Sequence, residues 1–140
     1  MGTQDAGCVF CKIVAGELPG HKVYEDDDVL AFLDITPMTR GHTLVIPKPH
    51  HRNLLETPAA ALQPVTAAIP KIAEAVVEAT DADGFNVLQS NEPCAGQCVF
   101  HVHFHVVPRR EGDGLGLGFR QSDPVEDDLE ETAGAIRAAM

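Results

Sequence analysis

The chain has 140 residues, of which 44% are hydrophobic, and this apolar fraction suits one packed domain and is too high for a disordered chain. Ten Lys and Arg against 21 Asp and Glu give a formal net charge of −11, with no basic run that could follow a phosphate backbone, so no nucleic-acid partner is expected. No apolar stretch approaches the roughly 18–20 residues of a membrane span, and the N-terminus lacks a signal pattern. We therefore expect a soluble, cytoplasmic protein without a membrane partner.

The first part of the chain predicts a short helix and three strands. Residues 8–17 combine a Cys-x-x-Cys spacing with apolar side chains, which favours a knuckle followed by a short helix. The ranges 21–25 and 29–34 are separated by an acidic turn and are rich in β-branched and aromatic residues, so they predict a hairpin. The range 42–47 is mostly apolar and ends at Pro47, which is typical of a strand inside a sheet.

The range 54–80 predicts the main helix, because its apolar residues recur at steps of three and four. Pro58 and Pro64 suit first-turn positions, and Thr57 is a possible cap. Pro70 lies inside the pattern, where it removes a backbone hydrogen bond, so we expect a break or bend there.

The ranges 85–89 and 99–107 predict two further strands that flank a polar loop at 90–98. No internal repeat or linker divides the chain, so residues 1–140 are expected to form one domain with its core at 8–110.

The C-terminal range 111–140 contains a glycine-rich segment and a predicted final helix. The helix is expected from Pro124, with Asp123 and Glu126 as a capping pair. Its apolar stripe consists of Val125, Leu129, Ile136 and Met140.

His101, His103 and His105 alternate with the apolar residues Val102 and Phe104, so in a strand the three rings share one face. Neighbouring rings would lie about 6–7 Å apart and the outer two about 13 Å, too far for all three to bind one ion. The three histidines must therefore divide their roles. A solvated histidine-rich edge strand and a His-x-His metal pair remain alternatives.

The four cysteines fall in two close pairs, Cys8 with Cys11 and Cys94 with Cys98. Without a secretory signal, metal or thiol chemistry is favoured over disulfides. Two thiolates and two imidazoles make a closed tetrahedral zinc site, which His50 or His51 could complete together with His101. Thiol redox chemistry, plain core packing and the second cysteine pair as competing ligands stay open.

Five sequence blocks occur in the order in which a known family carries them. They are FLDITP at 32–37, GHTLVIPK at 41–48, QSNE at 89–92, GQ at 96–97 and HVHFHVV at 101–107. Over roughly residues 8–109 the chain resembles a histidine triad protein of the nucleotide-binding branch, in its bacterial zinc-containing form. The resemblance implies an α+β fold with a five-stranded antiparallel sheet, one long helix and short helices, which dimerises into a ten-stranded sheet.

The resemblance also implies reaction at the α-phosphate of a purine nucleotide, an AMP or GMP derivative, through a covalent nucleotidyl-histidine. His103 corresponds to the nucleophile, held by the backbone carbonyl of His101, and His42 supports the cluster from a neighbouring strand. His105 corresponds to the residue that contacts the phosphate and can protonate the leaving group.

Further binding residues follow from the same resemblance. Those that correspond to phosphate-binding residues are Asn91, Gly96, Gln97 and Cys98. A thiol is a weak donor, so the backbone amide of Cys98 is an alternative contact. Asp34 corresponds to the carboxylate that accepts from the ribose hydroxyls. The implied base pocket consists of Val9, Phe10, Ile13, Phe32 and Ile35, and core packing is the alternative for each.

The family's zinc ligands correspond to Cys8, Cys11, His50 and His101, and such a closed site implies one structural zinc per chain. The first function expected is that of a purine nucleoside phosphoramidase. Dinucleoside polyphosphate hydrolysis is the second expectation, and a non-catalytic nucleotide-binding or interaction module is the third. A homodimer is expected in each case.

Overall fold

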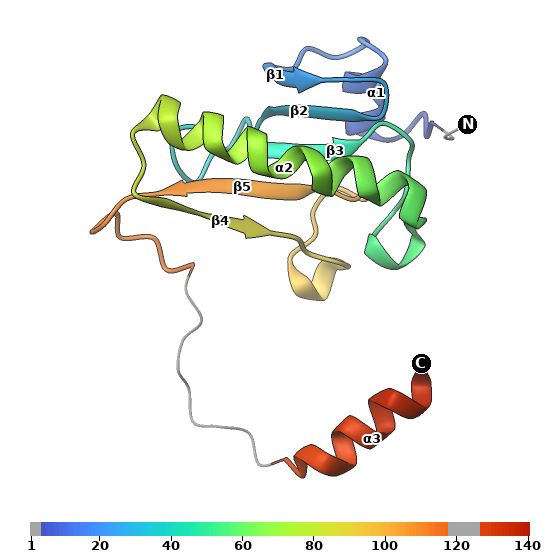
Figure 1. Ribbon diagram of the computed structural model, residues 1–140. Helices are drawn as coiled ribbons and strands as arrows, with labels where there is room; N and C mark the ends of the chain where they lie inside the picture. Colours follow the sequence, from blue (N-terminus) through green and yellow to red (C-terminus); the bar gives the residue numbers. More distant parts are fainter. Residues whose placement is uncertain (1–3, 118–126) are drawn as a thin grey trace.

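The computed structural model describes residues 4–117 and 127–140, and its centre is a five-stranded antiparallel sheet (Figure 1). The strands are β1 (Lys22–Glu25), β2 (Val29–Leu33), β3 (Thr43–Pro47), β4 (Gly84–Leu88) and β5 (Phe104–Arg109). Their spatial order is β1-β2-β3-β5-β4, and every neighbouring pair is antiparallel. This order places β3 beside β5, so the residues around His42 lie next to those around the three alternating histidines.

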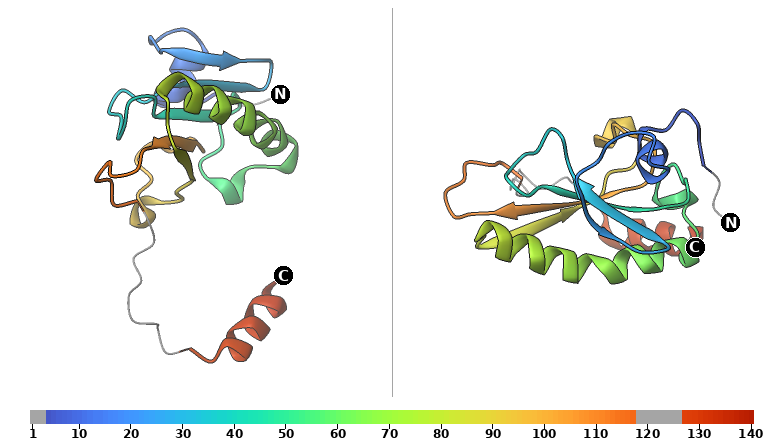
Figure 2. Two further views of the ribbon diagram at one scale, coloured as in Figure 1. Left: turned by 60° about the vertical axis from the view of Figure 1, so that its left-hand side comes forward. Right: turned by 90° about the horizontal axis from the view of Figure 1, so that it is seen from above.

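Two helices cover opposite faces of the sheet. They are α1 (Val9–Val14) and α2 (Ala59–Thr80), and the view from above in Figure 2 shows one on each side. Short 3₁₀ turns occur at Leu54–Glu56 and Pro93–Ala95. Among the helices that the structure describes, none is long and apolar enough to cross a membrane.

Alternation along the strands builds a separate apolar cluster on each face. The strand residues that pack against α2 are Val29, Ala31, Val45 and Val106. Those that pack with α1 are Leu30, Phe32, Leu44 and Ile46. Paired residues of antiparallel strands share a face, and His105 pairs with Leu44, so the His105 side chain lies on the α1 face. The face toward α2 is thus an apolar core, whereas the face toward α1 carries His105 beside its apolar cluster.

The long helix differs from its sequence prediction at its start and at the prolines inside it. It begins at Ala59, Pro58 is its N-terminal cap residue without a side-chain bond, and the Thr57 hydroxyl instead donates to the Asn53 carbonyl. Pro64 lies beyond the first turn. The helix continues through Pro70 to Thr80, so a break there is wrong, and the alternative of a bend stays a prediction. The buried stripe that spans this proline consists of Val65, Ala68, Ile72, Ala73 and Val76. Packing of this stripe outweighs the lost hydrogen bond.

The strand expected at 99–107 is shorter, because β5 begins only at Phe104. Before it, the Val102 N–H donates to the carbonyl of His51 at 2.7 Å, outside the sheet ladder. His101 and His103 therefore lie in the segment that enters the strand, where their rings can turn in different directions.

The C-terminal helix α3 (Leu129–Ala139) begins later than predicted, because Asp128 caps its first turn and residue 127 is not helical. The expected start at Pro124 and the expected capping pair, Asp123 and Glu126, lie outside the described residues. None of the residues of α3 is buried, and Figure 1 shows the helix apart from the sheet.

Gly41, which precedes His42, has a positive φ and no room for a side chain, so a glycine is required at this position. Its φ is +95°, and an added Cβ would lie 2.5 Å from Thr80 Cγ2 at the end of α2. We expect Gly41→Ala to lower the free energy of unfolding by about 2–3 kcal/mol in urea titrations. Gly16→Ala is the control, because Gly16 has φ +78° but no atom within 4 Å of the added Cβ. Equal losses in the two variants would show that the contact with Thr80 does not matter.

Candidate functional site

Four histidines gather where β3 and β5 meet, and they divide into two clusters. The ring centroids of His103 and His105 are 4.9 Å apart, and those of His42 and His105 are 5.1 Å apart. The ring of His101 turns instead toward His50, at 5.1 Å, and toward the cysteines of α1 and its cap. The division of roles that the strand spacing predicts is therefore present in the geometry.

His103 is held with one ring nitrogen occupied and the other free. Its Nδ1–H donates to the carbonyl of His101 at 2.7 Å, which leaves the lone pair on Nε2. The edge of the Phe10 ring packs against the imidazole, with centroids 5.2 Å apart. Burial lowers the pKa of His103, so its ring is neutral near pH 7. A neutral, oriented imidazole with a free nitrogen is a nucleophile.

The tautomer of His105 follows from a chain of hydrogen bonds that starts at the backbone. The Met38 N–H donates to His42 Nδ1 at 3.1 Å, so His42 carries its hydrogen on Nε2. This Nε2–H donates to His105 Nδ1 at 2.8 Å. His105 therefore carries its own hydrogen on Nε2 and is a hydrogen-bond donor beside His103 without being charged.

Burial also keeps the second pair of rings uncharged. The pKa of His105 falls to about 4, first because of burial and then because of the neighbouring His103 and His42. Burial likewise lowers the pKa of His42, although the nearby Asp34 carboxylate opposes the shift. At neutral pH the site consequently offers N–H donors and lone pairs, not positive charge.

Asp34 lies at the end of β2, with Oδ2 3.6 Å from His42 Nε2. Its Oδ1 accepts from the backbone N–H of Thr36 at 2.9 Å and from the Thr36 hydroxyl at 3.1 Å. The neighbouring Ile35 is 87% exposed. The carboxylate is therefore fixed by one oxygen while the other faces the histidine cluster.

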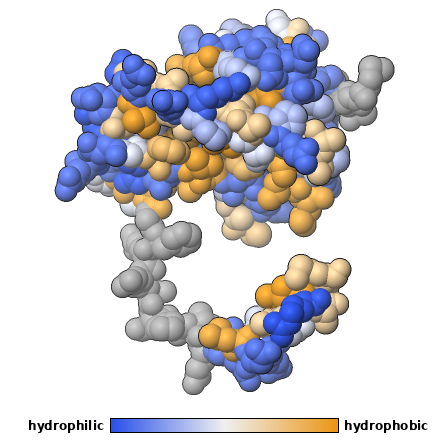
Figure 3. Space-filling model, in the orientation of Figure 1, coloured by the Kyte–Doolittle hydropathy of each residue, from blue (hydrophilic) through white to orange (hydrophobic). Residues whose placement is uncertain are grey.

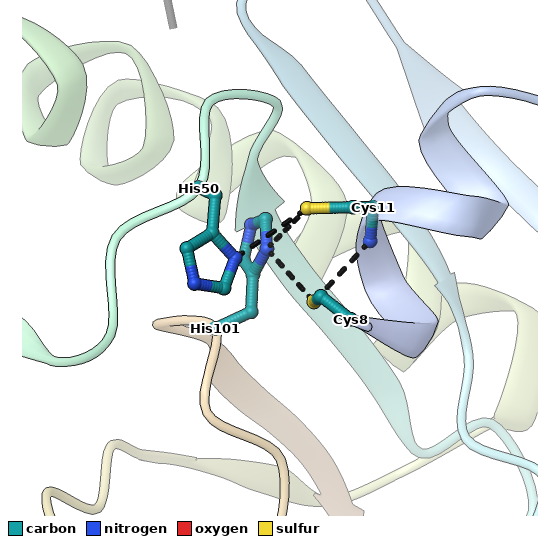
Figure 4. A group of neighbouring side chains, drawn as sticks. All are labelled: Cys8, Cys11, His50 and His101. Carbon is teal, nitrogen blue, oxygen red and sulfur yellow. Dashed lines mark hydrogen bonds between the residues drawn. The ribbon is translucent and has the colours of Figure 1, made fainter. Parts of the chain in front are cut away.

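Cys8, Cys11, His50 and His101 form the second cluster, and their sulfur and nitrogen atoms all lie within 4.8 Å of one another (Figure 4). Cys8 Sγ is 3.5 Å from His101 Nδ1, and Cys11 Sγ is 3.4 Å from His50 Nδ1. Tetrahedral zinc with ordinary Zn–S and Zn–N bonds would hold sulfur and nitrogen about 3.5 Å apart. The four residues therefore fit a zinc site in both donor type and spacing.

The surroundings of this cluster also fit a cation. His101 Nε2–H donates to the Pro47 carbonyl at 2.7 Å, which leaves Nδ1 free to coordinate. Backbone N–H groups of Asp5 and Cys11 point at the two sulfurs, each at 3.4 Å. Burial raises the pKa of the Cys11 thiol to about 11 when no metal is bound, so a cation is what would favour its thiolate.

The competing ligands from the sequence lie elsewhere. His51 is not part of the cluster, and Cys94 and Cys98 are both exposed. Position thus selects His50 over His51, and Cys8 with Cys11 over the second cysteine pair, as the members of this cluster. His101 joins the two clusters, because its ring belongs to the metal-type site and its carbonyl holds the ring of His103.

The loop at 89–98 follows β4, whose last residue, Leu88, pairs with His105. Gln97 is buried, and its Nε2 donates to the carbonyls of Arg52 at 2.7 Å and Val99 at 3.1 Å. Asn91 Oδ1 accepts from the Leu54 N–H at 2.8 Å. The side chains of Gln97 and Asn91 therefore fix the shape of the loop.

The N–H groups of Glu92, Ala95, Gly96 and Gln97 donate within the loop, so the backbone N–H of Cys98 is a donor that the loop can offer to a ligand. Within the described residues, the N–H of Cys98 has no acceptor, and Gly96 adopts φ +94° beside it. The Cys98 thiol is exposed and donates only a long 3.7 Å contact to the Gly96 carbonyl. This arrangement favours the Cys98 amide over its thiol as a ligand contact.

The apolar residues proposed for a base pocket divide into two groups. Phe10, Ile13 and Phe32 are buried in the cluster on the α1 face. Val9 and Ile35 are 48% and 87% exposed and are the ones open to a ligand.

The sequence analysis did not identify two groups that shape the site. They are the backbone N–H of Met38, which binds His42, and Arg52, whose carbonyl binds Gln97. A backbone N–H has no residue signature, and Arg52 carries no motif.

Comparisons with known proteins agree with this geometry. The HIT domain family model matches residues 15–112. Adenosine 5'-monophosphoramidase HNT1 of Saccharomyces cerevisiae is 46% identical over 118 residues, which cover 84% of this chain and 72% of that protein. Adenylylsulfatase HINT3 of Arabidopsis thaliana is 48% identical over 113 residues, covering 81% of this chain and 57% of that protein.

Solved structures are similar as well. A Streptococcus mutans protein is 51% identical with a TM-score of 0.92, covering 99% of this chain and 88% of that chain. A zinc-bound histidine triad family protein from Mycobacterium smegmatis is 46% identical with a TM-score of 0.73, covering 95% of this chain and 92% of that one. These matches confirm the expected fold, and the chain belongs to the HIT, or histidine triad, family.

Proposed function

We propose that this protein is a nucleotide hydrolase that acts at the α-phosphate of purine nucleoside 5'-phosphoramidates through a nucleotidyl-histidine. The observation that carries this proposal is the neutral His103, whose Nδ1–H is held at 2.7 Å by the His101 carbonyl while Nε2 stays free. The phosphoramidase named among its relatives adds support.

In the first step, His103 Nε2 attacks phosphorus and the bond from phosphorus to the leaving nitrogen breaks. The carbonyl of His101 stabilises the positive charge that the substituted ring acquires, because it accepts from Nδ1–H. The leaving nitrogen takes the proton of His105 Nε2–H and departs as the amine. Water then attacks the same phosphorus and returns one proton to His105 Nε2, which releases the nucleoside monophosphate and restores both His103 and His105.

The remaining residues position the nucleotide. Asp34 accepts from the ribose hydroxyls through the oxygen that faces the histidine cluster. The loop supplies the backbone N–H of Cys98 to the phosphate oxygens, and its shape depends on Gln97 and Asn91. The exposed Ile35 covers the base or ribose. Local N–H donors suit a protein of net charge −11, which gives no general attraction for anions.

Two other functions use the same groups. Dinucleoside polyphosphate hydrolysis differs only in the leaving group, and a relative named adenylylsulfatase indicates a further leaving group for this type of site. A non-catalytic binding module has no need for a nucleophile beside a positioned donor, so the arrangement of His103 and His105 favours an enzyme.

Cys8, Cys11, His50 and His101 would hold a structural zinc, because all four positions are filled by protein ligands and none is left for water. The chemistry that zinc supplies in such a site is charge compensation for two thiolates and a fixed ligand geometry. The zinc-bound Mycobacterium smegmatis relative supports this proposal.

The expected homodimer would form along the β4 edge of the sheet. Phe85 and Val87 are 46% and 42% exposed, and Val87 pairs with Val106, which places it on the face that carries α2. Figure 3 shows apolar surface in this part of the molecule, below α2. An exposed apolar edge strand favours pairing with a second copy.

The cytoplasmic location, the single domain over 1–140 and the absence of nucleic-acid partners stay predictions.

Zinc analysis tests the metal proposal. Protein purified without chelators should contain about one zinc per chain by mass spectrometry, and Cys11→Ser should lose it. The variant should melt roughly 10 °C lower, because breaking a buried metal site costs about 3 kcal/mol or more. Cys94→Ser is the control, since Cys94 is exposed. Zinc retained in Cys11→Ser, or absent from the native protein, contradicts the proposal.

Sedimentation velocity tests the dimer. The native protein should sediment at twice the 15.0 kDa chain mass, and Val87→Lys should sediment as a monomer because it places a charge on the apolar edge. Val23→Lys on β1, at the opposite edge, is the matched control, since Val23 is 51% exposed. Dissociation by Val23→Lys alone would assign the interface to the other edge.

Kinetics test the nucleophile. His103→Asn should lower the rate of AMP release from an adenosine phosphoramidate by at least about a thousandfold, and should abolish the adenylyl adduct in intact-protein mass spectra. His21→Asn should keep the native rate, because His21 is exposed before β1. A panel with adenylyl sulfate and a diadenosine polyphosphate then ranks the leaving groups. A native protein that binds AMP but turns over none of them would be a binding module.

A further inference from the structure

Glu92 has a backbone conformation that is unfavourable for its residue type. Its φ is +73° and its ψ is 158°, a region that essentially only glycine occupies. In the described part of the chain, Asp81 is the other non-glycine residue with positive φ, and it has the common left-handed conformation at the end of α2. Such strain persists only where the surroundings hold it, so the contacts of Glu92 are informative.

Three neighbours hold Glu92 in this conformation. Arg52 binds its carboxylate with two nitrogens, Nε to Oε2 at 2.9 Å and Nη2 to Oε1 at 2.8 Å. Asn53 Nδ2 donates to Oε2 at 2.8 Å. On the backbone side, the Glu92 N–H donates to Gln97 Oε1 at 2.7 Å. Both the side chain and the main chain of Glu92 are thus fixed.

Arg52 and Asn53, which hold the carboxylate of Glu92, belong to the segment that begins with His50 of the metal-type cluster. The carbonyl of Arg52 accepts from Gln97 Nε2 at 2.7 Å, and the guanidinium lies over the Phe100 ring at 4.3 Å. The carbonyl of His51 accepts from Val102 N–H at 2.7 Å. Residues 50–53 therefore brace both the loop at 89–98 and the segment that leads to His103.

We propose that Glu92 is a positioning residue, whose ion pair with Arg52 holds the loop at 89–98 so that the backbone N–H of Cys98 faces the nucleotide phosphate. This inference rests on the proposed function, because it assigns the loop to the phosphate. The loop starts beside His105, since Leu88 pairs with that residue, and it ends three residues before His101. A change at Glu92, in the middle of the loop, therefore alters where the backbone N–H groups of the loop lie relative to the histidines.

The exposure of the ion pair between Arg52 and Glu92 indicates that the pair positions the loop and adds little to the stability of the whole fold. The side chains of Arg52 and Glu92 are 41% and 39% exposed, and exposed ion pairs contribute little to global stability. Loss of the pair should consequently leave the fold intact and affect mainly the local conformation of the loop.

The test compares two ligands that differ only in the phosphate, AMP and adenosine, by calorimetric titration of the full chain. Glu92→Ala should raise the Kd of AMP at least about tenfold and change the Kd of adenosine by less than about twofold. Glu92→Ala combined with Arg52→Ala should cost less in AMP affinity than the sum of the two single variants, because the two residues share the ion pair. Melting temperatures should stay within a few degrees of the native value.

The matched control is Asp113→Asn, which breaks a similar two-contact ion pair with Arg109, at 2.8 and 2.9 Å, outside the loop. This variant should bind AMP like the native protein. Glu92→Gln keeps the side-chain shape, should weaken AMP binding about threefold or more, and carries the test if Glu92→Ala does not fold.

An unchanged AMP Kd in folded Glu92 variants would overturn the positioning role. An equal loss for AMP and adenosine would also overturn it, because it would show a general structural effect. Failure of the native protein to bind AMP refutes the proposed nucleotide function itself, and with it this inference.

Discussion

The structure depends on the two polar ends of His101. Its ring Nδ1 lies 3.5 and 3.6 Å from the sulfurs of Cys8 and Cys11, while its carbonyl accepts from His103 at 2.7 Å. Its Nε2–H is occupied by the carbonyl of Pro47, the last residue of β3. Because one residue links the metal-type cluster, the central strand and His103, the position of the N-terminal helix and the tautomer of His103 are coupled.

Burial keeps the histidine rings of the site uncharged, so the rings offer no positive charge to a ligand. The pKa of His103 and of His42 is lowered mainly by burial, and His105 titrates at about 4, so the cluster is uncharged near pH 7. In a chain of net charge −11, an anionic group must then be recognised by short-range N–H donors. The hydrogen bonds from Met38 to His42 and from His42 to His105 leave His105 Nε2–H as one such donor, and the backbone N–H of Cys98 is another.

Packing on the far face makes this arrangement possible. The α2 helix and the α2-facing side chains of the strands supply an apolar core, so the α1 face is free to carry buried polar side chains that each make at least one hydrogen bond, such as His42, His101 and His103. The same packing explains why α2 continues through Pro70, where local propensity predicts a break. Here the contacts of Ile72, Ala73 and Val76 decide the conformation after the proline.

The sequence by itself determined the order of the strands in the chain, the long helix and the residue types that meet in the two histidine-containing clusters. Period-two and period-3.6 apolar patterns and the HVHFHVV block are local, and local patterns survive without tertiary information. The start of β5 at Phe104, not at residue 99, could not be predicted, because it depends on a hydrogen bond from Val102 to the distant His51.

Tertiary structure alone decided which candidates meet. Spacing left His50 and His51, and both cysteine pairs, as possible ligands, and only the fold brings Cys11 within 3.4 Å of His50 across 39 residues of sequence. Likewise, the strained Glu92 and its partner Arg52 lie 40 residues apart in sequence, in segments without a common motif. Distances and tautomers arise from contacts between segments that are remote in sequence, and no residue pattern records them.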